Sequence, residues 1–313
     1  MKTFRTLILT AAVAASGALV ACNEPTRYDQ ANFSDEGNVQ KNAGNYWKRD
    51  NFWNGMPKTV NKVAITQFNV EYVTENVSKS GASAFSVIGV MEMAGAGHRE
   101  RQYADDFKKE FPTKIYAGFV DALKAEGIEA VPMTDLTKLP GFNDLKTGQA
   151  GGSYNQSGRD LLGHADNSQQ VKIQIYPAQG LPLIDDGWFN AGNNFNAEAK
   201  VVGDSGAQAG LRVRIRVALD DDGHAVLDKG AVINVTYDYE KQEWQKGNPQ
   251  WVAKQRHTLV SSGAFRDDVA CVDAKEFQMF KGDVYTVNIP KFEASILKMY
   301  PTFAKMAAKQ LRS

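Results

Sequence analysis

The amino-acid sequence predicts an α+β fold, in which a strand–helix–strand unit is followed by an antiparallel β-meander and a C-terminal amphipathic helix. Three patterns carry this prediction. Residues 63–73 have the character of a strand, and within them Phe68, Val70 and Tyr72 alternate with polar residues with the period of two that is typical of a strand. Every second residue between 211 and 219 is aliphatic, which predicts a further strand. Apolar residues between 291 and 311 recur with helical spacing.

The strand–helix–strand unit needs a crossover helix, which we expect at residues 99–126, and a second strand, which we expect at 128–133. Ile115 and Phe119 recur four residues apart and mark the buried side of the helix. Pro112 is expected to open the last helical segment, because proline is favoured at the first helical position. Two strands joined in this way pair in parallel.

The β-meander is predicted over residues 211–260, with a hairpin turn at Asp220–Gly223. In the C-terminal helix, Pro301 is expected to introduce a kink or to split the helix in two. The apolar stripe of this helix consists of Phe292, Ile296, Met299, Phe303, Met306 and Leu311.

Composition limits the classes of function. The chain has 36 basic and 36 acidic residues, so it lacks the basic excess of a dedicated nucleic-acid binder, and we expect no nucleic-acid partner. A hydrophobic content of 43% is that of a globular protein with a substantial core.

The N-terminal residues indicate where the protein resides. Residues 1–21 combine a short basic start with an apolar middle, as in a secretory signal peptide. The tetrapeptide Leu19-Val20-Ala21-Cys22 resembles the lipobox of bacterial lipoproteins. This resemblance implies that Cys22 carries acyl chains that attach the protein to a membrane. Asn23 resembles the residue found in lipoproteins sorted to the outer membrane, which implies its periplasmic face.

The position of this motif and the composition of the chain predict three regions. Residues 1–21 are the signal peptide, and residues 22–56, which are polar and rich in Asn and Gly, form a tether between lipid and body. Residues 57–313 form a single globular domain with a flexible Gly-rich loop near 142–170. Trp47, Phe52 and Trp53 are candidates for docking the end of the tether onto this domain.

No catalytic motif has the pattern that its chemistry requires, so an enzyme is the less favoured interpretation. The tetrapeptide Gly203–Gly206 matches the short segment around a protease serine, yet lacks a recognisable histidine motif and is interpreted as a turn. Gly95–Gly97 lacks the third glycine of a dinucleotide fingerprint, and the four histidines lack metal-ligand spacing. We therefore expect no cofactor and no metal. Cys271 is interpreted as a buried structural thiol.

The three arginines of the strand at 211–219 form the one candidate binding feature. Arg212, Arg214 and Arg216 alternate with aliphatic residues and therefore point to the same face. Two interpretations follow from this pattern. One is a solvated face of the sheet, and the other is a surface for docking an acidic partner.

Residues 60–135 resemble the curli-secretion lipoprotein and TolB N-terminal-like group. The resemblance rests on residues 61–68 (Asn-Lys-Val-Ala-Ile-Thr-Gln-Phe), a following helix, and residues 126–131 (Glu-Gly-Ile-Glu-Ala-Val). It implies an accessory in envelope assembly or secretion, with envelope protein partners or a homo-oligomer. Channel-forming members carry two long membrane-inserting hairpins, whereas Asp228-Lys229-Gly230 interrupts the best candidate hairpin here, which favours a periplasmic domain.

Two functional hypotheses result. The first is a lipid-anchored, non-enzymatic envelope protein that acts as a scaffold or accessory in envelope assembly or secretion. The alternative is a periplasmic ligand-binding protein or hydrolase whose site lies beside the loop at 142–170.

Overall fold

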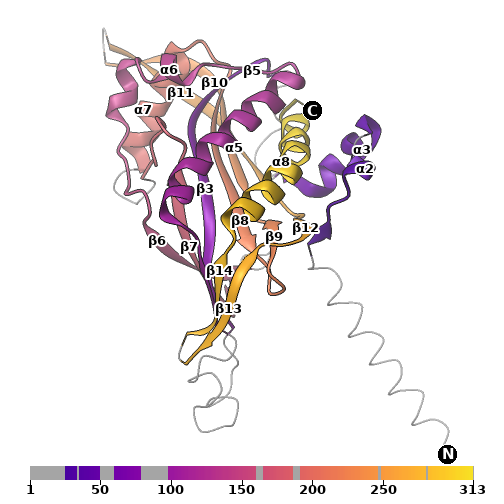
Figure 1. Cartoon of the computed structure of the whole chain (residues 1–313). Helices are drawn as coiled ribbons and strands as arrows, with labels where there is room; N and C mark the ends of the chain where they lie inside the picture. Colours follow the sequence, from indigo (N-terminus) through magenta and orange to yellow (C-terminus); the bar gives the residue numbers. More distant parts are fainter. Residues whose placement is uncertain are drawn as a thin grey trace, which may run out of the picture.

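The computed structural model describes residues 25–33, 35–49, 60–78, 98–159, 165–185, 191–245, 248–279 and 281–312 (Figure 1). The helices are α2 (Gln30–Phe33), α3 (Glu36–Tyr46), α5 (Asp105–Ala125), α6 (Met133–Leu136), the 3-10 helix η1 (Pro140–Asp144), α7 (Ala191–Asp204) and α8 (Ile289–Arg312). The strands are β1 (Thr26–Arg27), β2 (Trp47–Arg49), β3 (Lys62–Ser78), β4 (His98–Gln102), β5 (Glu129–Ala130), β6 (Ser153–Arg159), β7 (Ala165–Pro177), β8 (Ala209–Leu219), β9 (His224–Leu227), β10 (Val232–Gln245), β11 (Asn248–Ser261), β12 (Phe265–Ala270), β13 (Val272–Gln278) and β14 (Gly282–Val287).

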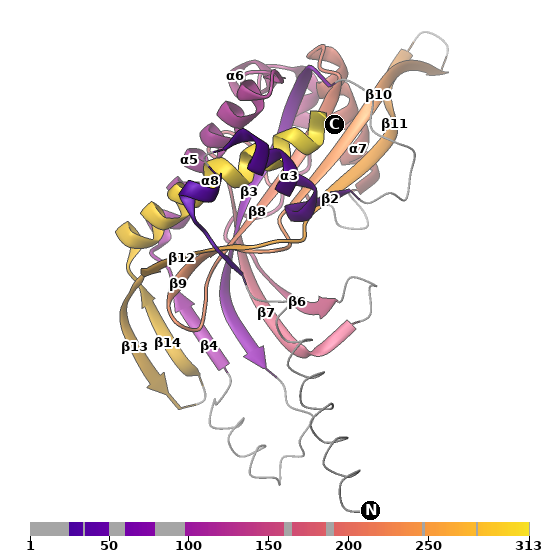
Figure 2. The same ribbon diagram turned by 90° about the vertical axis from the view of Figure 1, so that its right-hand side faces the viewer.

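The predicted α+β class is confirmed, and the described strands form one mixed sheet. Its centre is β3, which pairs in parallel with β8 and β5 and antiparallel with β7 and β4. The parallel pairing of β3 with β5 around α5 is the predicted strand–helix–strand unit. The predicted meander is also present, because β8 pairs antiparallel with β9 and β10, and β10 with β11 (Figure 2).

The crossover helix is shorter than predicted. Residues 98–102 form β4 instead of the start of the helix, and this strand pairs with β3 on one side and β14 on the other. The Glu, Arg and Gln side chains of this segment favour helix locally, but the tertiary pairing overrides that weak preference. Ordinary helix then begins at Asp105.

Pro112 does not open a helical segment but lies inside the continuous helix α5. A proline has no N–H, so it cannot bond the carbonyl of Lys108 four residues earlier. The hydroxyl of Tyr72, on the underlying strand β3, donates to that carbonyl at 3.4 Å. Pro301 likewise lies within α8, which spans the predicted C-terminal helix without being split.

Helices α5 and α8 lie side by side over one face of the sheet and enclose the main core (Figure 1). Gly118 of α5 permits close approach, because a Cβ at this position would lie 3.3 Å from the ring of Tyr300 on α8. Burial of each large apolar side chain contributes roughly 1.5–3 kcal/mol to folding. The whole predicted stripe of α8 is buried: Phe292, Ile296, Met299, Phe303, Met306 and Leu311.

The predicted tether is wrong for residues 25–33 and 35–49, because these residues pack against the body. Strand β1 pairs with β12, and β2 pairs with β11. Trp47 is 1% exposed, and its Nε1 donates to the carbonyl of Phe303 at 3.1 Å. The composition is polar overall, but its few aromatic side chains, including Tyr28 and Tyr46, are buried and provide the docking. Phe52 and Trp53 lie outside the described residues.

The predicted flexible loop near 142–170 also takes a different form. Within residues 142–159 and 165–170, the chain forms the end of η1, strand β6 and the start of β7, and β6 and β7 pair as an antiparallel hairpin. Strand β6 and the first part of β7 are polar, so no alternation of aliphatic residues marks them. Gly151, with a φ of +77°, starts the hairpin and its N–H bonds the carbonyl of Ile175 at 2.8 Å.

Helix α7 covers the face of the sheet opposite to α5 and α8, and Trp251 of β11 packs against the C-terminal end of this helix. The indole Nε1 of Trp251 donates to Asp204 at 2.8 Å, and its ring lies directly against Gly203. Ser205 and Gly206 end the helix, and the Ser205 hydroxyl donates to the carbonyl of Val202. The protease-like tetrapeptide is therefore the C-terminal end of α7, in agreement with its interpretation as a turn.

Gly203→Ala is expected to destabilise the fold by about 1–3 kcal/mol, because a Cβ would overlap the ring of Trp251. Urea unfolding measures the loss. The matched control is Gly44→Ala in α3, where the nearest atom would be 3.7 Å away; this change should stabilise by about 0.5–1 kcal/mol. Equal effects of the two substitutions would contradict the packing of Trp251 on α7.

Candidate functional site

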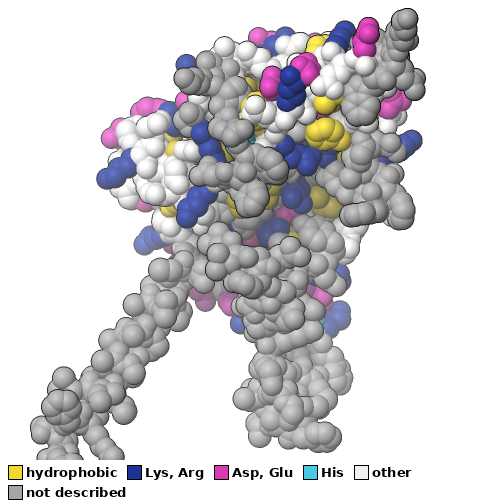
Figure 3. All heavy atoms as spheres, turned by 180° about the vertical axis from the view of Figure 1, so that it is seen from behind, with side chains coloured by type: hydrophobic (Ala, Val, Ile, Leu, Met, Phe, Trp, Pro, Cys, Tyr) yellow, Lys and Arg dark blue, Asp and Glu magenta, His cyan; other side chains and the backbone are white. Residues whose placement is uncertain are grey.

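The three predicted arginines do share one face of β8. In the parallel pairing with β3, Arg212 lies opposite Gln67, Arg214 opposite Asn69, and Arg216 opposite Glu71. These six side chains, which we call the polar grid, point away from α5 and α8. Figure 3 shows this side of the molecule, with Lys and Arg side chains in dark blue near the middle of the body.

Arg212 is closed off by Glu198 of α7. Its Nε lies 2.9 Å from both carboxylate oxygens of Glu198, and its Nη2 lies 2.6 Å from Oε2. The two side chains are 7% and 2% exposed. Thr66 donates a further hydrogen bond to Glu198. A bidentate pair in this environment fixes α7 on the sheet.

Glu71 joins the other two arginines. Its Oε2 accepts from Nε and Nη2 of Arg216 at 3.0 and 2.8 Å, and its Oε1 lies 3.6 Å from Nη1 of Arg214. Glu71 is 1% exposed and Arg216 is 12% exposed, whereas Arg214 is 39% exposed. Arg214 is thus the one arginine of the three with substantial access to solvent.

Neither the solvated face nor the docking surface predicted for Arg212, Arg214 and Arg216 describes all three arginines. Arg212 and Arg216 are neither a solvated face nor a docking surface, because they are buried in ion pairs. Desolvation explains the arrangement: an arginine inside a protein needs a carboxylate partner. Only Arg214 retains the exposure that docking requires. The sequence pattern correctly predicted that the three arginines share one face, but it did not predict the carboxylates of Glu198 and Glu71 that pair with them.

Two amides of the polar grid were not singled out from the sequence. Asn69 is fully buried, and neither its Nδ2 nor its Oδ1 has a hydrogen-bond partner among the described residues. Gln67 is 4% exposed and its Oε1 is likewise without a partner. Their alternation with Phe68 and Val70 signals a polar face, but not that the face is buried.

Burial also changes the acid–base behaviour of Tyr239, which lies near the Glu198–Arg212 pair. Burial, followed by the charge of Glu198, raises the pKa of this phenol well above its ordinary value. Its hydroxyl hydrogen-bonds to Thr236. Tyr239 therefore stays protonated and extends the network from α7 to β10.

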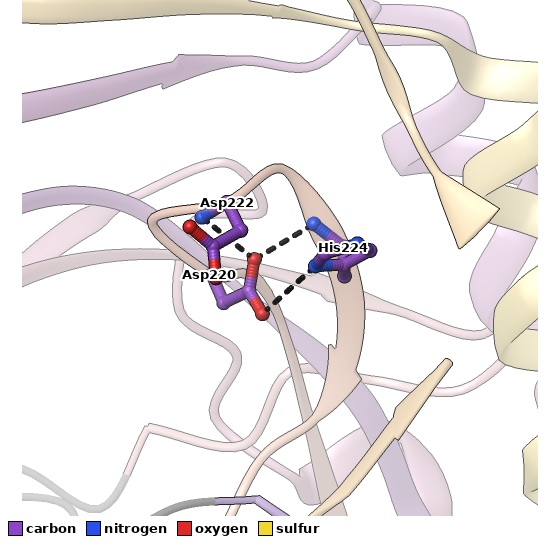
Figure 4. A group of neighbouring side chains, drawn as sticks. All are labelled: Asp220, Asp222 and His224. Atoms are coloured by element: carbon purple, nitrogen blue, oxygen red, sulfur yellow. Dashed lines mark hydrogen bonds and ion pairs between the residues drawn. The ribbon is translucent and has the colours of Figure 1, made fainter. Parts of the chain in front are cut away.

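The hairpin turn between β8 and β9 gathers a second polar cluster, consisting of Asp220, Asp222 and His224 (Figure 4). Their potential ligand atoms lie within 4.8 Å of one another. However, Asp220 Oδ1 accepts from the N–H groups of Asp222 and His224 at 3.0 and 2.7 Å. Arg266 Nη1 lies 3.5 Å from Asp220 and 3.9 Å from Asp222 and already supplies a positive charge. The cluster thus acts as a turn stabiliser.

Cys271 is buried, as predicted from the sequence. It is the single residue between β12 and β13, and its N–H donates to the carbonyl of Gly223 at 2.7 Å. Burial raises the pKa of the thiol. Cys22, His164 and Gly95–Gly97 lie outside the described residues.

Comparisons with known proteins return no matching family model, no similar curated protein and no similar solved structure. Among the described residues, no helix combines the length and apolar character needed to cross a membrane.

Removing one member of the Glu198–Arg212 pair should be costly. Glu198→Leu or Arg212→Met leaves a buried charge without its partner and is expected to destabilise by about 3–5 kcal/mol, whereas the double substitution should cost much less. Denaturant midpoints measure these losses. The control is Arg214→Met, which removes an exposed, longer pair and should cost no more than about 1 kcal/mol. Additive single effects would contradict the pairing.

The thiol of Cys271 should resist modification in the folded protein. We expect slow reaction with a maleimide at neutral pH and rapid reaction in denaturant, measured by mass. Because the folded-state pKa is raised, the thiol's contribution to stability is present below about pH 8.5 and falls as the pH rises above the pKa of the unfolded thiol. Rapid labelling without unfolding would contradict burial.

Proposed function

We propose that this chain is a lipid-anchored bacterial envelope protein that acts as a non-enzymatic scaffold or accessory in envelope assembly or secretion. The lipobox residues Leu19–Cys22 provide the anchor, and the periplasmic face of the outer membrane is the proposed location. Partners in this proposal are the membrane, through acyl chains on Cys22, and other envelope proteins or further copies of the chain.

The observation that carries the proposal is the docking of the chain at Thr26, which only three residues separate from Cys22. Thr26 N–H bonds the carbonyl of Ala264 at 2.9 Å, and Tyr28 N–H bonds that of Arg266 at 2.8 Å. Three residues of extended chain reach about 10 Å. A lipid on Cys22 would therefore hold the body close to the bilayer, as suits a protein that works on partners at the membrane surface.

The chemistry of the polar grid supports a binding or structural role over hydrolysis. Glu71 of the polar grid and Glu198 beside it are each bonded to arginine, so their carboxylate oxygens already face a guanidinium group. A general base must instead lie within hydrogen-bond reach of a substrate proton.

Cys22→Ala is expected to move the protein out of the membrane fraction, because it removes the acylated thiol. Fractionation of cells and the mass of the N-terminal peptide measure the change. Cys271→Ala is the matched control, since it alters the other cysteine and should leave the protein membrane-bound. Persistence of the Cys22→Ala variant in the membrane would contradict the anchor.

Cross-linking in intact cells, followed by detergent extraction, tests the scaffold role. A stable oligomer or a reproducible envelope partner is the expected result. A monomer without partners contradicts a scaffold, and a hydrolytic activity in that monomer would favour the alternative of a ligand-binding protein or hydrolase.

A further inference from the structure

Large apolar side chains that remain exposed among the described residues are confined to one part of the chain. They are Val269 on β12 (45% exposed), Phe277 at the end of β13 (61%), Met279 just after it (68%) and Leu297 on α8 (38%). Scattered single exposures are ordinary on a protein surface, but these four all fall within 29 consecutive positions, from 269 to 297.

The same region receives the N-terminal end of the described chain. β1 pairs with β12, and Arg27 forms an ion pair with Asp268, the residue beside Val269. Lys298, the residue beside Leu297, donates to Asp267 of β12 at 2.8 Å. Val269 therefore lies on the strand that holds β1, and Leu297 lies next to the residue of α8 that bonds this strand. Cys22 precedes Pro25 by only three residues.

Phe277 and Met279 lie at the tip of the β13–β14 hairpin. This hairpin projects from the sheet at its lower edge in Figures 1 and 2. The N–H of Lys281 bonds the carbonyl of Gln278 at 3.0 Å and closes the turn. Lys275 and Lys281 flank the apolar tip, are 49% and 54% exposed, and form ion pairs with Asp283 of β14 and Glu100 of β4. Apolar tips with flanking lysines suit a bilayer interface, where lysine ammonium groups reach the headgroups.

We propose that Phe277 and Met279, at the tip of the β13–β14 hairpin, form a membrane-contact patch that rests in the interfacial layer of the bilayer. This proposal rests on the lipid anchor proposed above. A lipid on Cys22 fixes the position of the body but leaves its orientation free, whereas a second contact fixes orientation as well. The anchor keeps the patch near the bilayer, so a small apolar area suffices for persistent contact.

The bilayer is the occupant that the geometry favours because of the short reach to Cys22. With about 10 Å of chain between lipid and body, the surface around β1 and β12 cannot move far from the headgroups. Lipid can then displace water from the patch without a further entropic cost of association, because the anchor already holds the protein at the membrane. A second copy of the chain would have to find the same surface by diffusion within the membrane plane.

The test uses the lipidated full-length protein in phosphatidylethanolamine–phosphatidylglycerol vesicles. Met279→Cys is labelled with an environment-sensitive dye, and quenching by lipids brominated along their acyl chains is measured. We expect several-fold stronger quenching than for Asn143→Cys, an exposed position on η1, because only residue 279 contacts the interface. A second variant, Phe277→Ser combined with Met279→Cys, should reduce the quenching, and since both native side chains are exposed it should fold normally.

Separate readouts distinguish the patch from the anchor. Flotation with vesicles and the mass of the acylated N-terminal peptide report on Cys22 alone. If the protein floats but the dye at 279 is quenched no more than the dye at 143, the patch is overturned and the anchor stands. If the N-terminal peptide carries no lipid, the result contradicts both the anchor and the membrane-contact patch. A dye that becomes shielded in detergent in a concentration-dependent way would assign the surface to a second copy and overturn the bilayer contact.

Discussion

Burial of both faces of β3 is the constraint on which the rest of the structure depends. A strand covered on both sides normally carries apolar residues throughout. Here Phe68, Val70 and Tyr72 face the core, while Asn69 and Glu71 face the other side, where they are equally buried. A buried carboxylate needs a cation, so β8 must place arginines opposite it. A slip of one residue would turn every side chain of β3 to the wrong face.

The ion pairs that satisfy this constraint also position other elements. Glu198 belongs to α7, so its bond to Arg212 attaches that helix to the sheet. The same helix receives Trp251 from β11 at its C-terminal end. Strand β8, helix α7 and the β10–β11 hairpin are therefore held by a common set of contacts. Arg212 and Arg216 are the arginines that pair with the buried carboxylates on this side of the sheet, whereas the helical side is held by its apolar core.

Local periodicity explains which parts were predictable from sequence. The alternation of Phe68, Val70 and Tyr72, the alternation at 211–219 and the stripe of α8 are properties of neighbouring residues, and each was found in the structure. The partners of the arginines were not predictable, because Glu71 and Arg216 are 145 residues apart. The docking of residues 25–49 depends on contacts such as Trp47 to Phe303, separated by 256 residues. Composition alone made that segment resemble a tether.

The docked N-terminal segment changes what an anchor at Cys22 would do. A flexible tether would let the domain turn freely, whereas β1 ties the chain to β12 directly after the anchor. Tyr28 adds a ring contact with Phe265, 5.3 Å between centroids, and a hydrogen bond to Thr302 of α8. Because β12 continues through Cys271 into β13, the strand that holds β1 and the exposed hairpin are joined directly along the chain, although they lie at opposite ends of the strand order of the sheet. Lipid attachment would then constrain the orientation of the sheet as well as its location.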